Sequence, residues 1–128
     1  MEKQTMNSLA HNELPEELDE LEPSVLRPDG ELGATELRAI AQHCFRCAQE
    51  GQLRMVLDLS YVDHLDFRGV GMLTAARQLL KRAGGDLILA GASPYLAAIL
   101  RAAGAHGKLE LCATVEAARA QFYVGNAF

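Results

Sequence analysis

The residues best suited to chemistry in this 128-residue chain are two cysteines three positions apart, Cys44 and Cys47. Such a pair supports thiol–disulfide exchange when its first thiol lies at a helix N-terminus, where the helix dipole lowers the thiol pKa. Here the spacing of apolar residues places Cys44 well inside a helix, on the side that faces the core. We therefore predict that both cysteines are structural.

Histidines and carboxylates offer two other kinds of site. The histidines are His11, His43, His64 and His106. Their spacing does not match that of metal ligands, so no metal site is predicted. Asp58, Asp63 and Asp66 could be read as paired catalytic carboxylates. However, Asp66 has the position of a helix N-cap and Asp58 that of a strand end. No phosphate-binding glycine loop or serine-nucleophile motif occurs, so we predict no enzymatic activity and no cofactor.

The elements that must position these residues follow from the hydrophobic pattern. The predicted strands are residues 53–59, 86–90 and 109–112, after an extended stretch at 24–32 that a turn interrupts. The predicted helices are residues 34–50, 66–83 and 94–103, and a last helix after Thr114. Strands that alternate with helices form parallel sheets. The sequence therefore predicts one α/β domain, with a mixed, mostly parallel sheet of about four to five strands and about four helices.

Local residue choices set the expected helix ends and connections. Thr35, Asp66, Ser93 and Thr114 are the predicted N-caps, because their side-chain oxygens can accept hydrogen bonds from first-turn N–H groups. Residues 61–65 are predicted to be a connecting loop. From Gly69 to Ala76 the second helix is apolar on nearly every side. Such a stretch is either fully buried or presents a second apolar face to a partner.

Charge is distributed unevenly along the chain, which carries a formal net charge of −5. Residues 1–24 contain seven acids and one base, so the rest of the chain is nearly neutral. We interpret residues 1–23 as an acidic tail, 24–124 as the domain and 125–128 as a C-terminal tail. The acidic tail disfavours nucleic acid and anionic membranes. The lack of a long apolar run, together with three cysteines, predicts a cytoplasmic protein that does not insert into membranes.

One segment combines a strand end, a turn and the start of a helix in a recognisable order. The strand ends in Val56-Leu57-Asp58-Leu59-Ser60, and the turn reads Leu65-Asp66-Phe67-Arg68-Gly69-Val70-Gly71. The order resembles the STAS domain family, typified by bacterial anti-sigma factor antagonists. In that pattern a D-L-S strand end precedes an apolar–Asp–Ser–Ser/Thr–Gly–apolar–Gly turn. The similarity continues through Gly84-Gly85, Leu87-Ile88-Leu89, Gly91-Ala92-Ser93-Pro94 and Leu100 to Gly104, and covers roughly residues 25–122.

The resemblance implies a regulatory binding module rather than an enzyme. In the antagonist branch, the turn and the following helix dock onto an anti-sigma factor that is often a serine kinase. Phosphorylation of the second hydroxyl residue of the turn then breaks the complex, because it adds nearly two negative charges to the contact. In this chain Phe67 and Arg68 replace the two hydroxyl residues, and Arg68 has the phosphoacceptor position. The switch is therefore absent or has moved to Ser60, Thr74 or Ser93.

The predicted function is transcription regulation in a bacterium through contact with an anti-sigma factor or a related kinase-like protein. A homodimer is a further candidate assembly. The residues predicted to contact the partner are Asp66, Phe67, Arg68, Gly69, Met72, Ala75, Ser93 and Tyr95. Two interpretations of Arg68 are open: either Asp63 or Asp66 neutralises it, or it presents a charged anchor, beside Phe67, to an acidic partner.

Three alternative functions are kept. The chain could be the STAS-like subunit of a lipid-transport ABC ATPase, or a scaffold of a stress-sensing assembly. A thiol oxidoreductase that uses Cys44 and Cys47 is the enzymatic alternative. The family pattern also usually begins with one more strand, which here is missing, short or hidden around residues 9–14. The tail or a second copy of the chain could cover the sheet edge left open there.

Overall fold

The computed structural model describes residues 22–126. The predicted acidic tail up to residue 21, the strand considered around residues 9–14, and residues 127–128 therefore lie outside the described part. Four parallel strands form the main sheet, in the order β1-β3-β5-β6. Their bounds are β1 Ser24–Leu26, β3 Arg54–Asp58, β5 Asp86–Ala90 and β6 Glu110–Cys112.

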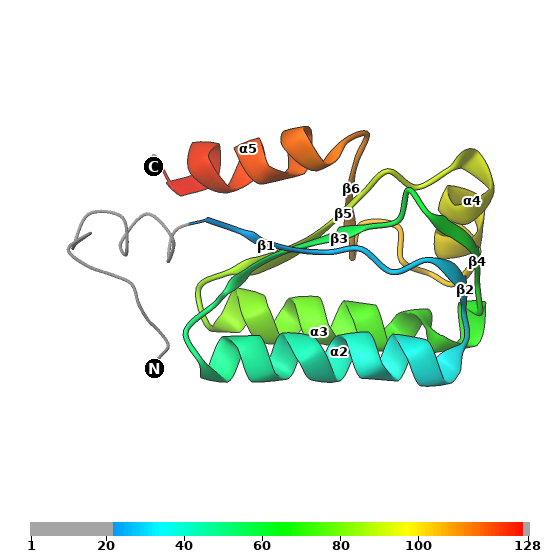
Figure 1. Cartoon of the computed structure of the whole chain (residues 1–128), viewed down its shortest axis with the longest axis horizontal. Helices are drawn as coiled ribbons and strands as arrows, with labels where there is room; N and C mark the ends of the chain where they lie inside the picture. The colour runs from blue at the N-terminus through cyan, green and yellow to red at the C-terminus, as the bar shows by residue number, and fades with distance from the viewer. Residues whose placement is uncertain (1–21, 127–128) are drawn as a thin grey trace, which may run out of the picture.

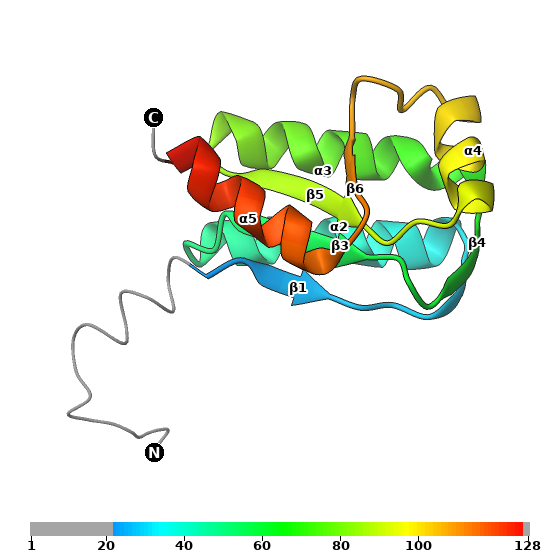
Figure 2. The same cartoon turned by 90° about the horizontal axis from the view of Figure 1, so that it is seen from above.

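Helices cover both faces of this sheet. The four described α-helices are α2 Ala34–Gln49, α3 Val70–Arg82, α4 Pro94–Ala102 and α5 Val115–Asn126. Helices α2 and α3 lie side by side on one face, and α5 lies on the other (Figure 1). The view from above confirms that α5 covers its face alone, whereas α4 lies at one end of the molecule, beside β4 (Figure 2). The predicted α/β fold with four helices and a mostly parallel sheet is confirmed.

The alternation of side chains along the strands divides the core into two layers. Met55 and Leu57 of β3 pack in the larger cluster with α2 and α3, whereas Val56 packs in a smaller cluster with Ala118 and Phe122 of α5. Residues 55–59 are all buried. A parallel strand covered on both faces has a nearly continuous apolar sequence, as this one does apart from Asp58.

Three of the four predicted capping side chains are confirmed, although Asp66 caps the 3₁₀ turn Phe67–Gly69 that precedes α3 rather than α3 itself. The side-chain oxygens of Asp66, Ser93 and Thr114 accept hydrogen bonds from the N–H groups of Arg68, Leu96 and Ala117. The prediction for Thr35 is wrong, because the N-cap of α2 is Gly33, two residues earlier. There Glu36 reaches back, and its Oε1 accepts a hydrogen bond from the Gly33 N–H at 2.9 Å.

The predicted loop at residues 61–65 is instead a strand, β4 Val62–Leu65. It pairs in parallel with β2 Gly30–Leu32 to form a separate two-stranded sheet. Val62 and Leu65 are buried, while Asp63 and His64 between them are exposed. This small sheet carries the chain from the end of β3 to the turn before α3. None of the helices in residues 22–126 is long and apolar enough to cross a membrane.

Candidate functional site

The site is built around the turn between β4 and α3. Phe67–Gly69 form one turn of 3₁₀ helix, capped by Asp66, whose Oδ1 accepts a hydrogen bond from the Arg68 N–H at 3.0 Å. Gly69 is buried where this turn presses against α2. A Cβ added there would lie 2.8 Å from Cδ1 of Leu37, so any larger residue would force the buried Leu37 side chain to shift.

Arg68 forms an ion pair with the residue that caps its own turn. Its Nε donates to Oδ1 of Asp66 at 3.1 Å and its Nη2 donates to Oδ2 at 3.0 Å. These hydrogen bonds hold the pKa of Asp66 below its ordinary value and raise the pKa of Arg68. Of the two carboxylates considered for neutralising Arg68, the structure therefore selects Asp66. The guanidinium stays at the surface, because the Arg68 side chain is 78% exposed.

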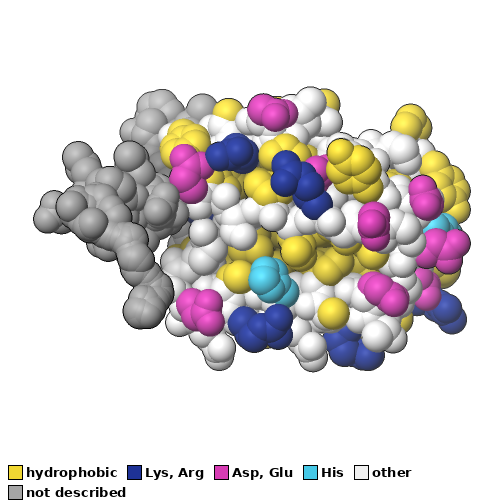
Figure 3. Space-filling view, in the orientation of Figure 1, with side chains coloured by type: hydrophobic (Ala, Val, Ile, Leu, Met, Phe, Trp, Pro, Cys, Tyr) yellow, Lys and Arg dark blue, Asp and Glu magenta, His cyan; other side chains and the backbone are white. Residues whose placement is uncertain are grey.

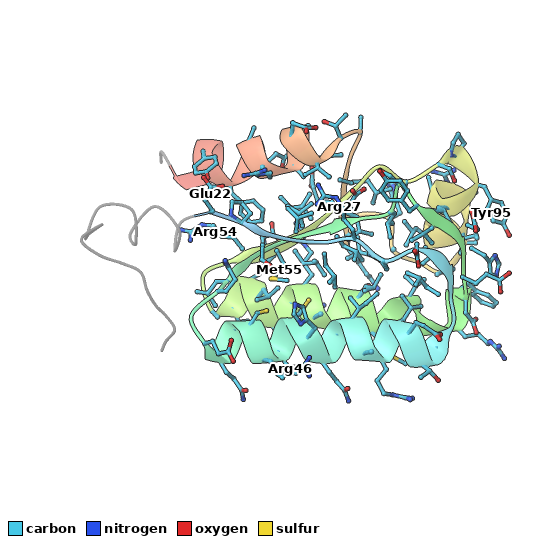
Figure 4. The ribbon with its side chains drawn as sticks, viewed as in Figure 1. Glu22, Arg27, Arg46, Arg54, Met55 and Tyr95 are labelled. Carbon is cyan, nitrogen blue, oxygen red and sulfur yellow. The ribbon has the colours of Figure 1, made fainter. Side chains whose placement is uncertain are left out.

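Aromatic side chains flank the turn. Phe67 is 58% exposed and Tyr95 of α4 is 55% exposed. The Tyr95 hydroxyl lies 2.8 Å from Nδ1 of His64 on β4, at hydrogen-bond distance. Figure 4 places Tyr95 at the α4 end of the molecule, opposite Glu22 and Arg54. The His64–Tyr95 contact therefore ties α4 to the strand that leads into the turn.

Helix α3 continues the surface away from the turn. Its buried side consists of Val70, Leu73, Ala76 and Leu80. On the outside, Gly71 and Ala75 are exposed and Met72 is half-buried. Nothing lies within 4 Å of a Cβ built on Gly71. The apolar stretch of this helix is thus not fully buried, and its outer side carries small side chains that permit close approach of another surface.

Asp58 supports the chain segment that leads to the site. Its carboxylate is buried at the end of β3 and accepts hydrogen bonds from the Ser60 N–H at 3.0 Å, the Ser60 hydroxyl at 2.6 Å and Arg27 Nε at 3.1 Å. Burial acts to raise the pKa of Asp58, but the hydrogen bonds from Ser60 and Arg27 outweigh it and hold the pKa below its ordinary value. The Asp58 carboxylate is therefore ionised and stabilises the local structure. Asp63 and Asp66 are not buried with it, so the three carboxylates do not form one site.

The two cysteines of the C-x-x-C pair lie inside α2, as predicted. Burial raises the pKa of the Cys44 thiol to about 11, and the nearby Cys47 adds to the shift. Burial also raises the pKa of Cys47, whose sulfur lies 3.4 Å from Nε2 of His43. Both shifts oppose thiolate chemistry. Within residues 22–126 no three histidine, cysteine or acidic side chains are grouped closely enough to hold a metal ion.

The residues predicted to contact a partner are brought together in part. Phe67 and Arg68 are exposed on one turn beside the half-buried Asp66. Met72 and Ala75 follow on α3, and Ser93 and Tyr95 lie exposed at the start of α4. Gly69 is buried, so it shapes the turn but presents no surface of its own. Sequence reasoning missed His64, Ile99 and Ala102, which join the site only through the packing of α4 on β4.

Comparison with known proteins identifies this arrangement. The STAS domain family model matches residues 16–118. A proposed anti-sigma factor antagonist from Thermotoga maritima has a similar structure, with a TM-score of 0.69 and 18% identity over 77% of this chain and 86% of that one. Similar too is phosphorylated SpoIIAA, a cell fate determinant from Bacillus, with a TM-score of 0.56 and 23% identity over 73% of this chain and 85% of that one.

The STAS domain of a SulP transporter from Vibrio cholerae also shares the fold, with a TM-score of 0.64 and 21% identity over 84% of this chain and 86% of that one. No curated protein matches the chain at the level of sequence. These structures agree with the chain in fold, and the family model spans most of its length. The chain therefore belongs to the STAS domain family.

Proposed function

We propose that this STAS domain is a regulatory protein–protein interaction module of the anti-sigma factor antagonist type, without enzymatic activity of its own. Its contact surface is the turn at residues 66–68, the outer side of α3 and the start of α4. The observation that carries the proposal is the exposed turn itself. It presents Phe67 and Arg68 at the two positions that hold hydroxyl residues in the antagonist pattern.

We further propose that the module works without a phosphorylation switch in this turn. Arg68 has no hydroxyl to accept a phosphoryl group, and its charge is paired with Asp66. Two of the three hydroxyls that could replace the switch already have structural partners. The Ser60 hydroxyl donates to Asp58, and the Ser93 hydroxyl accepts the first-turn N–H of α4. On this proposal the complex forms constitutively, and its level depends on the amounts of the two proteins.

The exposed face of α3 supports the same surface. Glycine inside a helix costs about 0.5–1 kcal/mol relative to alanine. Gly71 lies in the first turn of α3, and no neighbouring atom requires a glycine there. Close approach of a partner backbone explains a glycine at such a position better than the fold of the isolated chain does.

Affinity capture from native lysate, followed by mass spectrometry, tests the proposal. The wild type should capture a kinase-like anti-sigma factor, and Arg68→Glu should lose it, because repulsion between two carboxylates would replace the hydrogen bonds from Arg68 to Asp66 and distort the turn. Arg46→Glu is the matched control, since Arg46 is exposed at the far end of α2. The proposal fails if both variants capture the partner as well as the wild type does, or if no such partner is captured.

A phosphorylation assay tests the missing switch. The captured kinase should leave the wild type unmodified but should phosphorylate Arg68→Ser, which restores the hydroxyl. The modified variant should then dissociate from its partner. Phosphate found on Ser60, Thr74 or Ser93 of the wild type would instead show that the switch has moved.

A second candidate function comes from the similarity to transporter STAS domains. The Vibrio cholerae SulP domain matches this chain with a TM-score of 0.64. On this alternative the same turn and α3 face dock onto a membrane transporter. The capture experiment separates the two candidates, because a detergent-solubilised transporter, rather than an anti-sigma factor, would then be recovered.

A further inference from the structure

Beside the contact turn lies a hollow of about 250 Å³. It opens between β4 and the turn on one side and the second half of α4 on the other. Its lining residues are His64, Leu65, Asp66, Phe67, Ile99 and Ala102. Apart from the His64 ring and the Asp66 carboxylate, this lining is apolar. A hollow of this size and composition suits one apolar side chain of a partner, the form that many interface anchors take.

The walls of the hollow are held in place before any partner arrives. His64 and Tyr95 are joined at 2.8 Å across the β4–α4 junction, and their ring centroids lie 5.8 Å apart. Asp66 is held by its bonds to Arg68. A preformed pocket spares part of the ordering entropy that binding otherwise costs. The exposed ring of Phe67 forms the rim on the side of the turn.

The charge around the hollow is negative. Glu31 on β2 and Asp63 on β4 are exposed on the two-stranded sheet next to it. Within residues 22–126 neither carboxylate has a basic side chain within 4.0 Å. Figure 3 shows acidic side chains gathered at this end of the molecule.

The nearby cations offset only part of this charge. Arg68 is already paired with Asp66. Arg101, in the last turn of α4, lines a separate groove between α4 and β6. The face around the hollow therefore has unbalanced carboxylates beside an apolar depression.

We propose that this face receives a basic partner surface, in which one apolar side chain fills the hollow and flanking arginine or lysine side chains pair with Glu31 and Asp63. The inference rests on the proposed function, and it specifies the chemistry of the partner. It also decides between the two interpretations of Arg68. With its charge satisfied by Asp66, Arg68 is a neutral part of the contact rather than an anchor for an acidic surface.

Two matched tripeptides test the inference on the full-length ¹⁵N-labelled chain: acetyl-Arg-Phe-Arg-amide and acetyl-Glu-Phe-Glu-amide. In NMR titrations, the basic peptide should shift the amide signals of His64, Phe67 and Ala102, and the acidic peptide should bind more weakly. The double variant Glu31→Gln/Asp63→Asn should lower the affinity for the basic peptide by roughly two- to tenfold, as expected for two exposed ion pairs.

The double variant Glu50→Gln/Glu116→Gln is the control, because it removes the same charge from exposed positions at the C-terminal end of α2 and the start of α5. It should leave the shifts at the hollow unchanged. The inference is overturned if the acidic peptide binds equally well, if neither peptide shifts these signals, or if the two double variants weaken binding equally.

The titration needs no natural partner, so its outcome is independent of the lysate capture. Capture of an anti-sigma factor together with preference for the acidic peptide would leave the proposed function standing and refute the partner chemistry. Specific binding of the basic peptide without capture of an anti-sigma factor or a transporter would leave the partner chemistry standing and refute the proposed function.

Discussion

Replacement of Asp58 by asparagine should destabilise the domain through the chain segment that leads to the turn at residues 66–69. The native carboxylate is 3% exposed and accepts three hydrogen bonds, two from Ser60 and one from Arg27. Hydrogen bonds to a charged group contribute about 1.5–3 kcal/mol. The Arg27 contact adds little, because that side chain is 56% exposed and solvent screens it.

Asparagine keeps one oxygen for Ser60 but loses the charge and turns an amide NH₂ toward Arg27. We therefore expect Asp58→Asn to lower the free energy of unfolding by about 1.5–3 kcal/mol at neutral pH. Urea denaturation followed by circular dichroism measures this quantity. Glu116→Gln removes the same charge from an exposed position on α5 and should change the free energy of unfolding by less than about 0.5 kcal/mol.

The pH dependence of the free energy of unfolding provides a second test of the same contact. The pKa of Asp58 is lower in the folded chain than its ordinary value, so the folded state favours the ionised form. The resulting stabilisation is fully present above the unfolded pKa of about 3.9 and is lost as the pH falls through the lower folded pKa. The stability gap between wild type and Asp58→Asn should therefore be full at neutral pH and shrink in acid.

Two outcomes would refute this reasoning. If Asp58→Asn and Glu116→Gln have equal effects, the buried carboxylate contributes no more than a surface charge. If the gap between wild type and Asp58→Asn widens on acidification, the sign of the pKa shift is wrong.

Two further predictions concern packing and the thiols. Gly69→Ala should lower the free energy of unfolding by about 1–3 kcal/mol, because its methyl group would clash with Leu37. Gly71→Ala should raise the free energy of unfolding by about 0.5–1 kcal/mol, because alanine favours a helix and has space there. Equal urea midpoints for the two variants would contradict this account of the packing. The pKa of about 11 makes the Cys44 thiolate about 100-fold rarer than that of a thiol with the ordinary pKa of about 9.0. Iodoacetamide at mildly alkaline pH, with mass spectrometry, should therefore label Cys47 and Cys112 before Cys44, and preferential labelling of Cys44 would revive the oxidoreductase alternative.

Much of the fold could be predicted from the sequence because its signals are local. The apolar spacing of residues 34–50 predicted α2, which spans Ala34–Gln49. The capping bonds of Asp66 and Ser93 could be predicted, because a cap needs only a side-chain oxygen that accepts a hydrogen bond from an N–H two or three residues later. The order of strands and helices then restricted the topology to a parallel sheet.

The small sheet escaped prediction because its signal is neither periodic nor local. Val62–Leu65 is too short to show alternation, and its two buried residues are separated by two exposed ones. It becomes a strand only by pairing with β2, which lies about thirty residues earlier in the chain. Gly33 was not predicted as the N-cap of α2, because it has no side chain to form a capping bond. Its own N–H instead donates a hydrogen bond to the Glu36 side chain.

The sequence by itself determined the family pattern, the position of the turn before α3 and the absence of a hydroxyl at residue 68. Only the tertiary structure decided what surrounds that turn. Sequence left Asp63 and Asp66 as equal candidates to neutralise Arg68, and the backbone geometry of the turn selected Asp66. The hollow exists because α4 packs on β4, which brings Ile99 against a segment more than thirty residues away. Local order follows from neighbouring residues, whereas a binding surface depends on long-range packing that no single segment encodes.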